Sequence, residues 1–134
     1  MKKLSLIFVV LLIANYIFAV ELSDLRIIAD DGTFLGTLEN EFASDSIFNE
    51  FGKYGNEFNS QSILNEFGRY GNEFSQYSPF NEYSNKGPIL VDRRGKFYGR
   101  ITLNKYASDV TDLSYQIAVM LKKMQESKKP RFRF

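Results

Sequence analysis

Two short stretches that alternate apolar and polar residues lie on either side of the middle of the chain and resemble each other. Residues 27–42 (IIADDGTFLGTLENEF) and 89–106 (ILVDRRGKFYGRITLNKY) share an apolar run, an Asp, a Gly turn, and then Phe, Gly and a branched aliphatic residue. Such alternation, bounded by turn residues, predicts a β-hairpin over residues 26–38 and another over 88–104. Because an isolated hairpin is only marginally stable, we expect the two to join in one small antiparallel sheet.

The glycines of these hairpins predict their turns and their irregularities. Asp31-Gly32 suits a tight primed turn with positive φ, whereas residues 92–95 suit a slightly longer turn with Gly95 in the left-handed conformation. Gly36 and Gly99 interrupt the outgoing strands, which predicts a bulge or a close backbone contact at each.

Between the hairpins, residues 40–86 repeat with a period of 16. Residues 46–58 (SIFNEFGKYGNEF) recur as 62–74 (SILNEFGRYGNEF) and, truncated, as 78–83 (SPFNEY). Self-similarity of this kind usually means that one supersecondary unit is stacked, each copy being unable to bury its apolar face alone.

Within one copy, apolar residues fall at helical spacing, but Gly52 and Gly55 interrupt the pattern. We therefore predict short helical turns: Ser46 or Asp45 caps one turn, Gly52 ends it in a left-handed conformation, and Gly55 permits another tight turn. The amides of the repeated asparagines, Asn49, Asn65 and Asn81, are expected to satisfy turn backbone.

The repeat composition, rich in Tyr, Phe, Gly, Ser, Asn and Gln, is also that of disordered self-associating tracts. Ile47, Phe48, Ile63 and Leu64 nevertheless recur in register, which predicts order. Most of the aromatic residues of the region are then expected in the core: Phe42, Phe48, Phe51, Tyr54, Phe58, Phe67, Tyr70, Phe74, Tyr77, Phe80 and Tyr83.

A helix is predicted over residues 107–127, with Asp109 and Asp112 in its first turn and one apolar stripe that can cover the sheet. The stripe consists of Val110, Leu113, Ile117, Met120, Leu121 and Met124. Residues 128–134 (KKPRFRF) are expected to form a mobile basic tail. The fold class is thus α+β: a sheet of two similar hairpins, a C-terminal helix packed on it, and an aromatic, Gly-rich repeat region of short helical turns.

The first residues have the three zones of a secretory signal peptide, with Lys2 and Lys3 before an apolar run that ends near Ala19. Removing residues 1–19 from the 134 leaves 115, which is one small domain, assigned to residues 20–127. We expect an exported protein, in the periplasm or outside the cell, with no stable membrane span after processing.

The charges of the chain are segregated. Residues 40–86 hold seven acidic and three basic side chains, whereas eleven basic side chains follow Asp92. A basic end is therefore expected to lie on an acidic middle, within one molecule or between two. The processed chain is near neutral, so a nucleic-acid partner is not expected.

The repeats and the second hairpin resemble those of a group of uncharacterised secreted bacterial proteins. Their mark is a tandem S-I-x-N-x-[FY]-G-x-Y-G-x-x-[FY]-S run followed by S-P-F-N-x-Y, a Pro-led strand and a G-x-F-x-G-x-[LI]-T-x-N hairpin. These motifs correspond here to residues 46–59, 62–75, 78–83, 88–92 and 95–104. The resemblance implies export and one fold over residues 28–106, and it brings no activity with it.

The chain has no His and no Cys, which excludes Ser-His-Asp and Cys-His catalysis and His or Cys zinc sites. A glycosidase-like carboxylate pair remains conceivable among Glu50, Glu57, Glu66 and Glu73. Repeated Asn and Glu oxygens are also a weak signal for Ca²⁺. Because identical acids in every repeat are more typical of a solvated face, we assign no catalytic residue, metal or cofactor.

The expected function is non-enzymatic binding in the bacterial cell envelope, to another envelope protein or to a copy of the same chain, with a glycan as another candidate ligand. The candidate binding residues are Tyr54, Tyr70, Tyr77 and Tyr98, as an exposed aromatic platform, together with Arg93 and Arg94. The alternatives are a carboxylate-dependent enzyme acting on envelope polysaccharide and a self-assembling structural protein.

Overall fold

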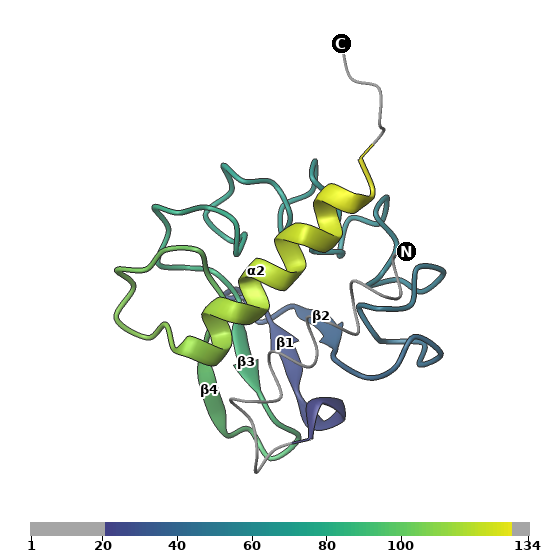
Figure 1. Cartoon of the computed structure of the whole chain (residues 1–134), viewed down its shortest axis with the longest axis horizontal. Coiled ribbons are helices and arrows are strands. Elements are labelled where there is room, and N and C mark those ends of the chain that lie inside the picture. Colours follow the sequence, from purple (N-terminus) through teal and green to yellow (C-terminus); the bar gives the residue numbers. More distant parts are fainter. Residues whose placement is uncertain (1–20, 130–134) are drawn as a thin grey trace.

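The computed structural model of the chain describes residues 21–129, in which one four-stranded antiparallel sheet is covered by one long helix (Figure 1). The predicted signal peptide and residues 130–134 lie outside the described part. The strands are β1 (Arg26–Ile28), β2 (Phe34–Thr37), β3 (Ile89–Val91) and β4 (Phe97–Arg100), and a 3₁₀ turn, η1 (Leu22–Asp24), precedes them. The helix α2 spans Asp112–Ser127. The predicted α+β class is confirmed.

The two hairpins join through their first strands, so the strand order is β2-β1-β3-β4. Ile27 of β1 pairs with Leu90 of β3, and both side chains are fully buried. They belong to one core cluster with Leu35 of β2 and with Ile117 and Leu121 of α2. The sheet therefore gains its stability from the apolar stripe of the helix, as the sequence predicts.

Both hairpins turn through the same three-residue loop. In the first, the amide of Gly32 donates to the carbonyl of Ala29, and the amide of Ala29 donates to the carbonyl of Thr33. In the second, the amide of Gly95 donates to the carbonyl of Asp92, and the amide of Asp92 donates to the carbonyl of Lys96. Gly32 and Gly95 have φ of +89° and +85°, and no described residue other than glycine has positive φ. The predicted left-handed Gly95 is confirmed, whereas the primed turn at Asp31-Gly32 is wrong, because only its glycine is left-handed.

Gly36 and Gly99 each lie at a shift in strand register, which confirms the predicted bulges. They also confirm the predicted close contacts. A Cβ on Gly36 would lie 2.9 Å from Tyr54 Cβ in the first repeat, and one on Gly99 would lie 2.5 Å from Thr111 Oγ1 at the start of α2. The repeat region thus packs against the first hairpin at Gly36, and the start of the helix packs against the second hairpin at Gly99.

The repeat region is ordered but contains no named helix or strand. From residue 38 to residue 86 the backbone runs through consecutive turns closed by bonds such as Asn49 N to Ser46 O and Gly52 N to Asn49 O. The predicted left-handed conformation of Gly52 is wrong, since the described glycines with positive φ are at other positions. Gly52 is required instead for close approach, because a Cβ there would lie 2.7 Å from the carbonyl oxygen of Ser44.

Helix α2 begins at Asp112, five residues later than predicted. The Thr111 side chain accepts a hydrogen bond from the Ser114 amide, and the Ser114 side chain accepts one from the Thr111 amide, which forms a capping box. Asp109 and Val110 therefore precede the helix. The sequence pattern did not reveal this start because the apolar stripe continues through Val110, outside the helix.

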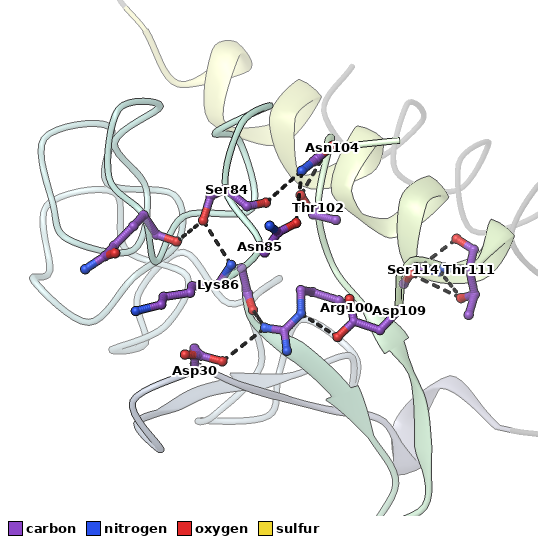
Figure 2. A network of polar contacts seen from close by, with 12 residues as sticks. Asp30, Ser84, Asn85, Lys86, Arg100, Thr102, Asn104, Asp109, Thr111 and Ser114 are labelled. Atoms are coloured by element: carbon purple, nitrogen blue, oxygen red, sulfur yellow. Dashed lines mark hydrogen bonds and ion pairs between the residues drawn. The ribbon is translucent and has the colours of Figure 1, made fainter. Parts of the chain in front are cut away.

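Arg100 joins four parts of the chain, as Figure 2 shows. Its Nε lies 2.7 Å from the Asp109 carboxylate, its Nη1 lies 3.2 Å from Asp30 in the first hairpin turn, and Nη1 also donates to the carbonyl of Gly87. The side chain is largely buried. Asn104 extends this network by donating from Nδ2 to the carbonyl of Ser84, at 3.0 Å.

One buried side-chain amide and three ion pairs join the repeats to the helix and to the two residues that follow it. Gln125 Nε2 donates to the carbonyl oxygens of Ile63 and Gly71, at 3.2 and 2.8 Å. The ion pairs join Lys122 to Glu73, Lys128 to Glu50 and Lys129 to Glu66. The expected contact between the basic end and the acidic middle therefore forms within one molecule.

A comparison of two glycines tests the hairpin–helix contact. Gly99→Ala is expected to lower the free energy of unfolding by about 1 kcal/mol or more beyond the effect of Gly95→Ala, measured by urea denaturation. Both substitutions force an L residue to positive φ, but a Cβ on Gly95 meets no atom within 4 Å, whereas one on Gly99 meets the helix cap. Equal losses of unfolding free energy in the two variants would show that the cap of α2 does not pack against Gly99.

Candidate functional site

Seven Asx turns, in which Phe or Tyr follows two residues after Asn, carry the most exposed aromatic side chains of the described chain. In each turn the Asn Oδ1 accepts a hydrogen bond of 2.8 to 3.0 Å from the backbone amide two residues later, which always belongs to Phe or Tyr. The asparagines are Asn40, Asn49, Asn56, Asn65, Asn72, Asn81 and Asn104. We call the aromatic residues of these turns the tip rings: Phe42, Phe51, Phe58, Phe67, Phe74, Tyr83 and Tyr106.

The tip rings are between 82% and 95% exposed. The prediction that the repeat aromatics are mostly core is therefore wrong for the six that follow Asn-Glu. The turn directs the side chain two residues after Asn outward, and the interior is filled instead by residues next to the repeated serines. Those that are buried include Ile47, Ile63, Leu64 and Phe80.

The seventh tip, Asn104-Lys105-Tyr106, was missed because it has Lys where the others have Glu. The spacing of Asn and an aromatic two residues later is the signal that identifies it. Figure 1 shows the loops of residues 40–86 projecting around α2 in an arc, from the blue loops to the teal ones, and the loop between β4 and α2 continues that arc. The tip rings therefore come from several loops arranged around one body.

Further hydrogen bonds hold several of these turns in place. Asn49, Asn65 and Asn81 each donate from Nδ2 to the carbonyl six residues earlier, at 3.1 to 3.3 Å. Ser46 Oγ accepts from the amide of Phe48 and donates to the carbonyl of Glu39, and Ser62 repeats this arrangement with Leu64 and Tyr54. The prediction that the asparagines satisfy turn backbone is confirmed.

The turns do not themselves require an aromatic residue. Asn59 makes the same bond, at 2.9 Å, to the amide of Gln61. Hydrogen bonding to the backbone thus explains the asparagines, and neither it nor burial explains the tip rings. An exposed ring at every one of these seven positions is a feature that folding does not account for.

The four candidate tyrosines lie in or against the core rather than on an open platform. Tyr70 is 7% exposed, and its hydroxyl donates to Asp31 Oδ2 at 2.8 Å, with Thr33 Oγ1 at 3.0 Å. Tyr54, Tyr77 and Tyr98 are partly buried against the core cluster. The prediction of an exposed platform led by these tyrosines is therefore wrong, because the hydroxyl of Tyr70 is bonded to the first hairpin turn and the other three rings pack against the core cluster.

Arg93 and Arg94, the candidate basic residues, are exposed in the second hairpin turn. Arg93 lies 3.3 Å from Asp24 and 3.6 Å from Glu39, so it holds η1 and the end of the first hairpin near this turn. In the described structure Arg93 forms exposed ion pairs, and such a pair typically contributes less than about 1 kcal/mol to the free energy of unfolding.

The repeat acids pair with different lysines of the helix and its C-terminal end. Lys122, Lys128 and Lys129 hold Glu73, Glu50 and Glu66 respectively. Within residues 21–129, no group of three or more acidic side chains is placed to hold a metal ion. The acids are therefore arranged as separate charges beside the tip rings.

Each hairpin turn has an aspartate bonded to a tyrosine. Partial burial acts to raise the pKa of Asp31, but hydrogen bonds from Thr33 and Tyr70, together with the charge of Arg69, outweigh it and hold this pKa below its ordinary 3.8. Backbone amides, first that of Lys96, lower the pKa of Asp92 in the same way. Burial and the partner aspartates raise the pKa of Tyr70 and of Tyr98.

Two asparagines of the same repeat test how the turns are stabilised. Asn65→Ala removes both the bond from the Phe67 amide and the bond to the Asn59 carbonyl, whereas Asn72→Ala removes the bond from the Phe74 amide. We expect Asn65→Ala to cost about 1 kcal/mol more, measured by urea denaturation. A larger loss for Asn72→Ala would contradict this assignment.

The Asp31 carboxylate predicts how stability depends on pH. Because its folded pKa is below its ordinary 3.8, the stabilisation is fully present above that value and is lost as the pH falls through the folded pKa. Between pH 5 and pH 2, denaturation curves should show a flatter decline for Asp31→Asn than for the natural chain. A parallel decline would show that the Asp31–Tyr70 bond does not favour the charged form.

The comparisons with known proteins add no relative to this geometry. No family model, curated protein or solved structure matches the chain. No described helix is long and apolar enough to cross a membrane. The resemblance to secreted bacterial proteins stays a prediction, and the site rests on the turns and their rings.

Proposed function

We propose that this protein is an exported, non-enzymatic binding module of the bacterial cell envelope, which binds an envelope protein through its tip rings. The observation that carries this proposal is the set of seven aromatic side chains that are 82% to 95% exposed, each two residues after the Asn of an Asx turn. Export rests on the predicted signal peptide in residues 1–19, which lies outside the described residues.

The chemistry of the tips suits a protein partner. Burying an exposed ring contributes roughly 2 kcal/mol through the hydrophobic effect, and aromatic residues are typical anchors of protein interfaces. Because Asx bonds and backbone contacts already hold the turns, little backbone conformational entropy is lost on binding. Six of the rings follow a glutamate, so charge complementarity favours a partner surface with basic groups beside apolar pockets.

The repetition of the tips favours a multivalent interaction. Once one ring is bound, its neighbours on the same rigid body are held close to the partner, so their binding is effectively intramolecular. Several weak contacts can then produce a tight complex. This explains why the chain repeats the whole tip, including its acid, rather than a single residue of it.

A triple ring variant tests the proposal. Phe51→Ser, Phe67→Ser and Tyr83→Ser in one chain should weaken binding to isolated cell envelopes at least about tenfold, since each anchor contributes roughly 1 kcal/mol or more. The melting temperature should change little, because these side chains are exposed. The measurement is a saturation curve of the purified, labelled protein on envelopes.

The matched control is Ser44→Ala, Ser60→Ala and Gln76→Ala, at exposed positions of the same loops, which should bind as the natural chain does. Protease treatment of the envelopes should abolish binding, whereas polysaccharide digestion should not. Unchanged binding by the ring variant would refute the proposal. Glu66→Gln with Glu73→Gln, assayed for turnover of envelope polysaccharide, addresses the enzyme alternative separately.

A further inference from the structure

The C-terminal end of α2 lies against two of the tips. Lys128 Nζ is 3.9 Å from the Glu50 carboxylate, and Lys129 Nζ is 3.1 Å from that of Glu66. Each acid immediately precedes a tip ring, Phe51 or Phe67, and these rings are 89% and 82% exposed. The backbone therefore leaves the described part of the structure beside two acid–aromatic tips.

The five residues that follow in the sequence, outside the described part, alternate cation and ring: Pro130-Arg131-Phe132-Arg133-Phe134. A proline does not continue a helix, and it favours extended backbone in the residue before it. In an extended segment, Arg131 and Arg133 project to one side and the two phenylalanines project to the other.

We infer that residues 131–134 dock in the same molecule on the two tips Glu50-Phe51 and Glu66-Phe67, with arginine beside glutamate and ring against ring. Five residues reach at most about 16 Å from Lys129, so the segment remains near the point where both lysines are already held. Offset or edge-to-face ring pairs contribute about 0.5 to 1.5 kcal/mol beyond their burial. Arginine beside an acid adds a charge-assisted contact.

The same molecule is favoured over a second copy for a physical reason. A short tether of this kind gives an effective concentration on the order of millimolar, which exceeds that of free copies in dilute solution.

This inference rests on the proposed function in one respect, because it names the ligand class of two of the tips: segments that alternate basic and aromatic residues. A partner of that chemistry then competes with the chain's own segment at Phe51 and Phe67, while the other tips stay open.

The test uses protein purified from its producing cell with isotope-labelled phenylalanine, and no partner. Arg131→Glu with Arg133→Glu should shift the ring signals of Phe51 and Phe67, whereas Arg93→Glu with Arg94→Glu in the second hairpin should not. The shift should be reproduced by raising the salt concentration, which screens exposed charge pairs. Unchanged Phe51 and Phe67 signals in the first variant would overturn the inference.

Two further measurements complete the test. If the difference between natural chain and variant disappears on dilution, with dissociation seen by sedimentation, the segment docks on a second copy and the inference is overturned. A free peptide KKPRFRF should bind the Arg131→Glu, Arg133→Glu chain with a Kd of about 0.1 mM or below and the natural chain at least about tenfold more weakly. Equal peptide affinities would also overturn it. Envelope binding by the ring variant is a separate readout, so either proposal can fail alone.

Discussion

Residues 40–86 must satisfy their backbone polar groups without a helix or a sheet. Unpaired buried amides and carbonyls cost free energy comparable to a lost hydrogen bond. Here the side chains of Asn and Ser supply the hydrogen bonds that a helix or a sheet would otherwise provide. Asn65, for example, accepts from one amide and donates to a carbonyl six residues earlier. Where the repeats meet the helix, the amide of Gln125 serves two further carbonyls. The 16-residue period is therefore the period of a hydrogen-bonding scheme, and the apolar residues follow it.

This scheme divides the aromatic residues into two sets. Residues beside the repeated serines, such as Phe80, enter the core, whereas residues two positions after asparagine, such as Phe51, leave it. The inward set joins the sheet and α2 in one cluster, which gives a short chain without disulfides a single interior. The outward set contributes nothing to that interior. The proposed function therefore uses the rings that folding does not require.

The two similar hairpins have the same local structure but contact different parts of the molecule. Each has a three-residue turn with a left-handed glycine, a bulged second strand and a glycine at the bulge. At Gly36 the missing side chain admits the first repeat, and at Gly99 it admits the cap of α2. Arg100 then joins the first turn, the end of the repeats and the segment before the helix through one guanidinium. The aligned glycines suggested close contacts, but the partners are distant in sequence and belong to different elements.

Local turn chemistry and periodic burial are enough to predict the hairpins, their junction in one antiparallel sheet, the helix and its apolar stripe. The residue pattern also indicated that the asparagines serve the turns and that the basic end meets the acidic middle. Which rings are buried became known from the folded arrangement. Apolar spacing in the repeats resembles that of a helix, but a chain of Asx turns has no fixed period of side-chain direction, so Tyr70 turns inward to Asp31 while Phe67 and Phe74 turn outward. The inward direction of Tyr70 is set by its long-range contacts with Asp31 and Thr33 of the first hairpin, which no local pattern contains.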